Sequence, residues 1–177
     1  MSAELLRHVN ALVADFAAGH GAVDLVGRRV DRAPDEYDAL VEAFEAFGVV
    51  GGAGVRPRDD EGRVLLARYE SADGWVDPGD GRRLGESYRE CAVHGVREAT
   101  SLDPETDDLV QVHLLNTDDR TDRLPVPNPY VVFEGRPTRQ DADAGDLRAG
   151  EDVADLRWVE TVPESLLYDE LALSDFG

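Results

Sequence analysis

The feature that most constrains the fold of this chain is a helix start at Ser87, placed between two groups of β-rich segments. Ser87 is followed three residues later by Glu90, which is the spacing of a capping box. In that motif each side chain accepts a hydrogen bond from the other residue's backbone N–H, so the helix begins at a defined position. We therefore predict a helix over residues 88–100. Its apolar positions are Cys91, Ala92 and Val96.

The segments on either side of this helix are typical of strands. Residues 49–58 and 63–70 flank Asp59-Asp60-Glu61-Gly62, which predicts a hairpin. We also expect a short helix near Pro163–Leu167. The further β-rich runs are residues 109–115, 130–135 and 155–160. Several strands with helices among them indicate a mixed α/β sandwich.

The first 47 residues follow a different pattern and form a predicted helix–strand–helix extension. Residues 3–18 place apolar side chains at helical spacing, residues 22–32 indicate a short strand, and a second helix opens at Pro34. We expect this extension to pack against the rest of the chain. The alternative is that one of its faces makes the contact of a homodimer.

The charge of the chain excludes several classes of partner. There are 38 Asp and Glu residues against 18 basic ones, all of them arginine, so the net charge is −20. Nucleic acid and anionic membranes are poor partners for such a surface. No apolar run is long enough to cross a bilayer, and a single cysteine, Cys91, makes neither an internal disulfide nor a cysteine-rich zinc site.

An acidic excess without lysine is also what we expect of a cytoplasmic protein from an extreme halophile. Molar salt shortens the Debye length to ~3 Å, so that like charges on the surface repel one another far less. The alternative is a protein that binds cations or polycations.

Residues 75–102 carry the motif that indicates a function. The positions that define it are Trp75, Pro78-Gly79, Gly85-Glu86-Ser87, Ala92, Val96, Glu98 and Leu102. In these residues and their spacing the chain resembles the Nudix hydrolase family, and the resemblance covers roughly residues 48–168. It implies an α/β/α sandwich of mixed sheet over residues 48–177. It also implies hydrolysis of a pyrophosphate bond in a nucleoside diphosphate-linked, nucleotide-type small molecule, with Mg²⁺ or Mn²⁺ held by helix glutamates.

The chain departs from the family's pattern at the positions that bind metal. Counted from Glu86, the arginine position holds His94, and two of the three glutamate positions hold Gly95 and Ala99. Glu98 is the one glutamate that remains. Because removing catalytic carboxylates raises the barrier by several kcal/mol, the resemblance implies an impaired or altered metal site.

Candidate site residues follow from the family positions and from helical spacing. The resemblance makes Glu98 and Glu86 the candidate catalytic residues. Glu90, His94 and Glu98 lie on one helical stripe with Glu86 near its start, so these four are candidate metal ligands; the alternative is a solvated acidic stripe. Acidic residues within 140–152 are candidate replacements for the missing ligands.

Arginines near the first hairpin and the loop before the helix are candidates for phosphate contacts, because a guanidinium binds phosphate with two hydrogen bonds. We assign Arg56, Arg68 and Arg82 to substrate binding, with counter-ions to an acidic surface as the alternative. The function expected is a Nudix-type hydrolase with an altered metal site. A catalytically inactive nucleotide-binding or interaction module on the same fold is the alternative.

Overall fold

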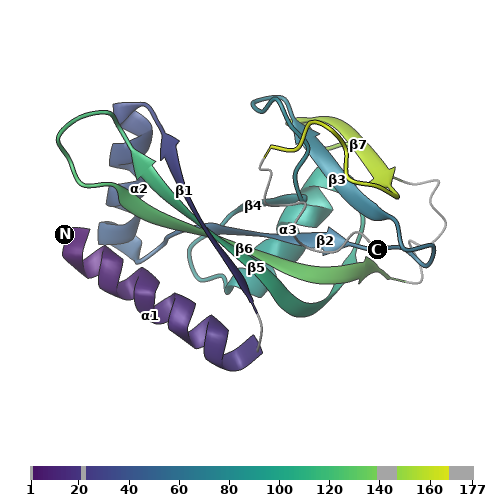
Figure 1. The fold of residues 1–177 in the computed structure, drawn as a ribbon, viewed down its shortest axis with the longest axis horizontal. Coiled ribbons are helices and arrows are strands. Elements are labelled where there is room, and N and C mark those ends of the chain that lie inside the picture. The colour runs from purple at the N-terminus through teal and green to yellow at the C-terminus, as the bar shows by residue number, and fades with distance from the viewer. Residues whose placement is uncertain (1, 21–22, 139–146, 168–177) are drawn as a thin grey trace.

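The computed structural model describes residues 2–20, 23–138 and 147–167. Two helices and a strand come first, followed by strands arranged around a third helix (Figure 1). The elements are α1 (Ser2–His20), β1 (Asp24–Asp31), α2 (Pro34–Phe47), β2 (Gly52–Pro57), β3 (Val64–Tyr69), β4 (Gly79–Gly81), α3 (Tyr88–Thr100), β5 (Pro104–Asp118), β6 (Val126–Pro137) and β7 (Val153–Val159). In the described part of the chain, no helix is long and apolar enough to cross a membrane.

The main sheet is mixed, as the sequence predicts. Its strand order is β1-β5-β6-β2-β4. β5 and β6 are antiparallel, as are β2 and β4, whereas β1 runs parallel to β5 and β2 runs parallel to β6. Strands β3 and β7 form a separate antiparallel pair.

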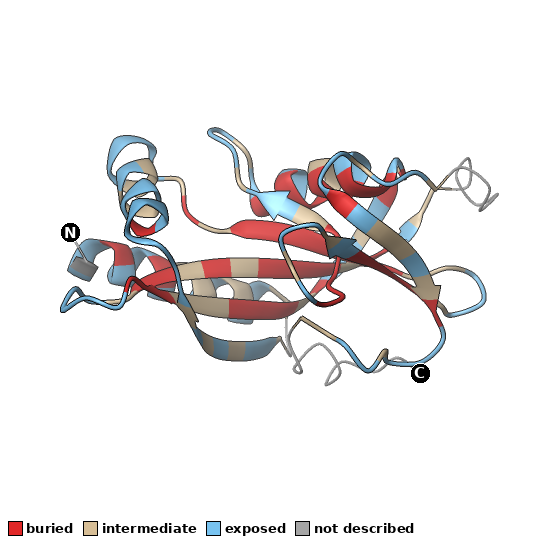
Figure 2. Ribbon diagram, turned by 90° about the horizontal axis from the view of Figure 1, so that it is seen from above, coloured by how far each residue is buried: buried red, intermediate tan, exposed pale blue. Residues whose placement is uncertain are grey.

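Helix α3 lies between these two sheets, and the main hydrophobic core forms around it. Cys91, Ala92 and Val96 are fully buried, which confirms the apolar face predicted for this helix. They pack against Val55 of β2 and Val131 of β6 on one side. Figure 2 shows buried residues along the strands of the main sheet and on α3. The core therefore fixes the helix that carries the family motif to both sheets.

The N-terminal extension is helix–strand–helix, as predicted, and its strand belongs to the main sheet. β1 pairs with β5 from Asp24 opposite Gln111 to Asp31 opposite Asp118. α1 and α2 meet at one end of the molecule (Figure 1), where the rings of His8 and Phe44 lie 5.5 Å apart. The domain boundary at residue 47 stays a prediction, because the extension shares hydrogen bonds with the strands that follow it.

Two predictions about elements are wrong. The turn at residues 59–62 forms, but the strands on either side share only the bridge between Arg58 and Val64, and β2 and β3 then enter different sheets. No helix forms at residues 163–167; instead Leu166 pairs with Trp75, and the chain lies along the second sheet. In both cases, pairing between distant segments overrides the local pattern.

Candidate functional site

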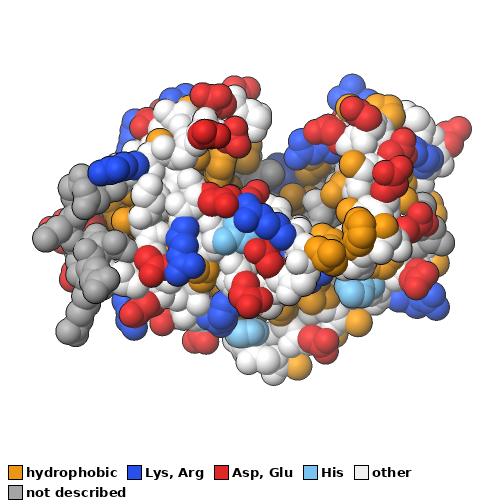
Figure 3. All heavy atoms as spheres, turned by 180° about the vertical axis from the view of Figure 1, so that it is seen from behind, with side chains coloured by type: hydrophobic (Ala, Val, Ile, Leu, Met, Phe, Trp, Pro, Cys, Tyr) orange, Lys and Arg blue, Asp and Glu red, His pale blue; other side chains and the backbone are white. Residues whose placement is uncertain are grey.

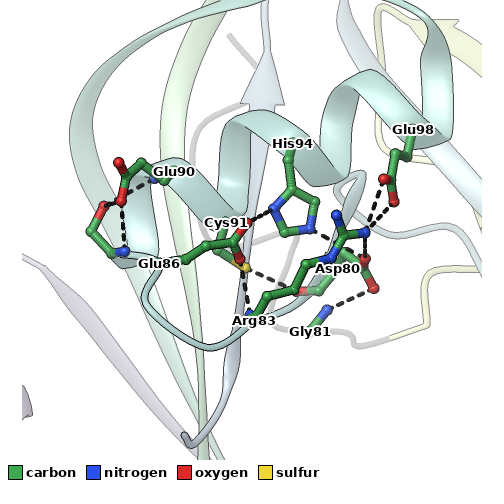
Figure 4. Close-up of polar contacts among 9 residues, drawn as sticks. Asp80, Gly81, Arg83, Glu86, Glu90, Cys91, His94 and Glu98 are labelled. Atoms are coloured by element: carbon green, nitrogen blue, oxygen red, sulfur yellow. Dashed lines mark hydrogen bonds and ion pairs between the residues drawn. The ribbon is translucent and has the colours of Figure 1, made fainter.

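The capping box predicted at the start of α3 is present, and it determines where Glu90 lies. The Ser87 hydroxyl accepts from the backbone N–H of Glu90, and one carboxylate oxygen of Glu90 accepts from the backbone N–H and the hydroxyl of Ser87, both at 2.8 Å. These hydrogen bonds hold the pKa of Glu90 below its usual value. Glu90 is therefore turned toward the cap (Figure 4), and the structure does not bring it together with the other candidate ligands.

The other candidates meet on the exposed side of α3, where β4 and the loop before the helix contribute further side chains. We call Asp80, Glu86, His94 and Glu98 the α3 cluster (Figure 4). His94 lies between two carboxylates: its Nδ1 is 2.7 Å from Glu86 Oε1, and its Nε2 is 3.3 Å from Asp80 Oδ2. One ligand atom each from Asp80, His94 and Glu98 lies within 4.8 Å of the others. The sequence identified three of these residues and missed Asp80, which belongs to β4.

Arg83 also reaches into the α3 cluster, from the loop between β4 and α3. Its Nη2 donates to both oxygens of Glu98, at 2.9 and 2.7 Å, and lies 3.4 Å from Asp80 Oδ2. Its backbone N–H donates to Glu86 Oε2 at 2.9 Å. The hydrogen bonds with Glu98 raise the pKa of the Arg83 guanidinium, which therefore carries its charge at any physiological pH. Figure 3 shows arginine and acidic side chains gathered around a histidine near the middle of one face.

Cys91 lies behind this cluster and is a core residue, as predicted. Its Sγ is 3.4 Å from the carbonyl oxygen of Asp80, and it also falls within a possible ligand group with Glu86 and His94. Burial raises the pKa of the Cys91 thiol to about 11. Because a thiol binds metal as the thiolate, this group is a weaker metal site than the one formed by Asp80, His94 and Glu98.

A family model described as the NUDIX domain matches residues 50–169, which include the α3 cluster, the β3–β7 pair and every strand of the main sheet except β1. The chain belongs to the Nudix family. This match confirms the resemblance seen in the sequence. The matched and adjoining positions include residues 48–57 and 63–69, the motif at 75–102, and strands β6 and β7.

Solved structures with the same fold support this assignment. A NUDIX hydrolase from Nitrosomonas europaea has a TM-score of 0.54 at 17% identity, over 68% of this chain and 64% of that one. A UDP-X diphosphatase has a TM-score of 0.52 at 18% identity, over 92% of this chain and 72% of that one. An Ap4A hydrolase from C. elegans has a TM-score of 0.50 at 16% identity, over 71% of this chain and 91% of that one. The chain thus spans less than two thirds of the Nitrosomonas protein. No curated protein matches it by sequence.

Two of the glutamate positions of the Nudix motif are closed by packing. A Cβ at Gly95 would lie 2.6 Å from the backbone nitrogen of Asp80 and 2.7 Å from the carbonyl carbon of Gly79, so glycine lets α3 rest directly on β4. Ala99 is buried against Ala67 and Val153 of the second sheet. Nudix hydrolases use divalent metal ions, and in this chain a side chain at position 95 would require the backbone to move, whereas Ala99 is buried in an apolar cluster.

The donors that remain fit a divalent ion of a particular kind. Two carboxylate oxygens, from Asp80 and Glu98, and one imidazole nitrogen, from His94, lie within 4.8 Å of one another. Mg²⁺ takes oxygen ligands, whereas transition-metal ions accept imidazole together with carboxylate. Two carboxylates and one imidazole are donors that transition-metal ions accept together.

The three arginines assigned to substrate binding lie in different places. Arg56 is buried in β2 and forms two hydrogen bonds to Asp77, at 2.9 and 2.8 Å. Burial lowers the pKa of Arg56, but the ion pair with Asp77 more than offsets it and leaves the pKa raised. Its guanidinium thus has a buried carboxylate as a partner.

Arg68 and Arg82 are near the surface and stack on aromatic rings. Arg68 lies 5.8 Å from the centre of the Trp75 ring, and Arg82 lies 4.8 Å from that of Tyr88. Arg82 also donates to the carbonyl oxygen of Gly48 at 3.2 Å. The structure does not gather these arginines into one site, and their contact with a substrate stays a prediction.

Among the described residues of the acidic stretch 140–152, none belongs to the α3 cluster. Residues 140–146 lie outside the described residues. Glu151 and Asp152 are exposed and belong to neither possible ligand group.

Proposed function

We propose that this Nudix protein hydrolyses a nucleoside diphosphate-linked compound by means of an altered metal site, in which Asp80, His94 and Glu98 hold the cation. The observation that carries the proposal is the grouping of these three donors within 4.8 Å, on β4 and α3 in the segment that resembles the Nudix motif. Two structures of the same fold, the UDP-X diphosphatase and the Ap4A hydrolase, are named for substrates that contain linked phosphates. They favour the same class of substrate for this chain.

The residues of the cluster have separate roles in this proposal. A divalent cation bound there would neutralise phosphate charge and lower the pKa of water. Glu86 Oε1 lies 2.7 Å from His94 Nδ1, without the geometry of a hydrogen bond, and we assign Glu86 the role of a positioning residue for the ring. With two of the Nudix glutamates replaced, we expect turnover to be slow, because each lost carboxylate removes electrostatic stabilisation of the transition state.

One set of contacts favours a second function, that of a nucleotide-binding module without catalysis. Gly95 and Ala99 are packed against backbone and core, and Arg83 already neutralises Glu98. A Nudix protein that had lost hydrolysis would be expected to have lost its metal-binding carboxylates in this way while keeping its fold.

The two functions are separated by measuring turnover and binding on the same samples. The protein is incubated in molar KCl with Mg²⁺, Mn²⁺ or Zn²⁺ and with ADP-ribose, a UDP-sugar, a dinucleoside tetraphosphate or a nucleoside triphosphate. Chromatography then quantifies released mononucleotide. We expect release with Mn²⁺ or Zn²⁺ that exceeds release with Mg²⁺, and loss of it in Asp80→Asn.

Glu105→Gln is the matched control, since Glu105 is an exposed carboxylate that pairs with Arg136 away from α3. Its turnover should equal that of the wild type. Binding of a nucleotide by calorimetry without release in any metal would contradict hydrolysis and support the module.

We also propose that the protein works in a salt-rich cytoplasm. The support is the net charge of −20 together with the absence of lysine, since all 18 strongly basic residues are arginine. The salt titration described in the Discussion tests this proposal.

A further inference from the structure

We infer that Arg83 is a displaceable internal cation of the α3 cluster, which sets how tightly the cluster binds a divalent ion. The inference concerns the site of the proposed function and rests on cation binding there, not on turnover. Arg83 is not one of the residues that define the Nudix motif. Its guanidinium contacts the carboxylates of Glu98 and Asp80, which an ion would need as ligands.

The contacts of Arg83 explain why it competes with a metal. One nitrogen, Nη2, lies 2.9 and 2.7 Å from the two oxygens of Glu98 and 3.4 Å from Asp80 Oδ2. Two of the three donors available to a cation are therefore satisfied by the same guanidinium (Figure 4). An ion that binds these oxygens has to replace those hydrogen bonds.

The charges around His94 explain why a cation is needed there at all. Asp80, Glu86 and Glu98 bring three carboxylates to one imidazole. Carboxylates at such separations repel one another, and a positive group between them relieves the repulsion. Arg83 supplies that positive group from within the chain.

The exposure of the pair explains why the guanidinium can leave. The side chains of Arg83 and Glu98 are 52% and 57% exposed, and ion pairs at such positions contribute little to stability. The backbone of Arg83 is held separately, through its N–H and Glu86. The side chain can thus swing into solvent while the loop stays in place.

Two of the three ligands, Asp80 and His94, have contacts that do not involve Arg83. Asp80 Oδ1 accepts from the backbone N–H of Gly81 at 2.7 Å, and His94 Nδ1 lies 2.7 Å from Glu86 Oε1. Glu98, the third ligand, contacts Arg83 itself. The apparent affinity for a cation is then the intrinsic affinity multiplied by the fraction of molecules in which the Arg83 side chain has left the cluster.

The test is a titration with Mn²⁺, followed by the electron paramagnetic resonance signal of the free ion. Three proteins are compared: the wild type, Arg83→Gln and Arg97→Gln. Arg97 lies on the same helix and pairs with Asp103, so its substitution removes an equal charge without touching the cluster. We expect Arg83→Gln to bind Mn²⁺ about tenfold more tightly and Arg97→Gln to bind it as the wild type does. Arg83→Ala serves as a second variant with the same expectation.

A further variant locates the ion. Adding Asp80→Asn to Arg83→Gln should reverse the gain in affinity. The inference is overturned if Arg83→Gln binds Mn²⁺ no more tightly than the wild type, if Arg97→Gln gains as much, or if the gain survives Asp80→Asn.

Failure of the inference and failure of the proposed function give different results. Tighter binding in Arg83→Gln without nucleotide release contradicts hydrolysis alone. Nucleotide release with an unchanged Mn²⁺ affinity in Arg83→Gln contradicts the inference alone. Absence of Mn²⁺ binding in every variant contradicts both.

Discussion

At the scale of single residues, Gly95 shows that a position can be determined by a neighbouring backbone. Glycine within a helix costs about 1 kcal/mol relative to alanine, and in the sequence nothing offsets that cost. In the structure, the missing Cβ is what allows α3 to approach Gly79 and Asp80. The position is therefore required by packing, although the Nudix motif places a ligand there.

We predict that Gly95→Ala destabilises the protein, by about 1–3 kcal/mol, because the added Cβ forces the backbones of α3 and β4 apart. Helix propensity alone predicts the opposite sign. Gly19→Ala in α1 is the control: nothing lies within 4 Å of a Cβ there, so that variant should be as stable as the wild type or more so. Denaturant unfolding of both variants measures the difference, and stabilisation by Gly95→Ala would contradict the packing described here.

A second prediction at this scale concerns pH. The pKa of Glu90 is lower in the folded state than in the unfolded chain, because the carboxylate accepts hydrogen bonds from Ser87. Its contribution to stability is therefore complete above the unfolded pKa, about 4.3, and is lost as the pH falls through the lower folded value. Glu90→Gln should lower stability at neutral pH and flatten the acid side of the stability curve.

Urea midpoints between pH 3 and pH 7 test that prediction. Glu105→Gln, which changes an exposed carboxylate outside the capping box, should leave the shape of the curve unchanged. If Glu90→Gln and the wild type lost stability in parallel on the acid side, Glu90 would not be the group responsible.

The candidate site could be predicted from sequence only in part, because spacing on a helix does not determine where a flexible carboxylate points. Glu90, His94 and Glu98 share a stripe, but Glu90 turns back to Ser87. Asp80 and Arg83 join from β4 and the following loop, and their approach depends on how α3 packs on that strand. The distribution of Arg56, Arg68 and Arg82 among separate partners depends likewise on the whole fold.

At the scale of elements, α1 attaches to the rest of the molecule through a narrow apolar face. Leu5 and Val9 are buried, at 2% and 1% exposure, in a cluster with Tyr37 of α2 and Val126 of β6. Leu6, the next residue along the chain, is 49% exposed. The extension therefore contributes its own part of the core.

We predict that Leu5→Ala lowers the free energy of unfolding by about 2–5 kcal/mol, because it leaves a cavity in this cluster. Leu6→Ala should change it by less than about 0.5 kcal/mol. Chemical denaturation of the two variants provides the measurement. Equal effects of the two substitutions would show that α1 does not pack as described.

The helices were predictable as elements, and the sheet was not predictable as a set of pairs. The three main helices were identified from apolar spacing and caps, since these signals are local. Strand partners are not local: β2 pairs with β6 and β1 with β5, although each strand is separated from its partner by other elements. For the predicted hairpin, the turn between β2 and β3 was therefore correct, but the predicted pairing of the two strands was wrong.

At the scale of the whole molecule, the charge of −20 predicts how stability depends on salt. The Debye length falls from ~8 Å near physiological ionic strength to ~3 Å at 1 M, so repulsion among the acidic side chains weakens. We predict that the melting temperature rises as KCl is raised from millimolar to molar concentrations. Calorimetry across this range measures it, and a melting temperature that fell would contradict adaptation to high salt.

The parallel pairing of β1 with β5 has a consequence for the order of folding during synthesis. A ribosome produces residues 24–31 long before residues 104–118, yet the two strands hydrogen-bond along the full length of β1. Contacts between segments so distant in the chain form slowly, since a long loop must close first. During synthesis β1 therefore stays without its pairing partner until α3 and β5 have left the ribosome. The strand that is synthesised first thus reaches its place in the sheet only after β5 has been made.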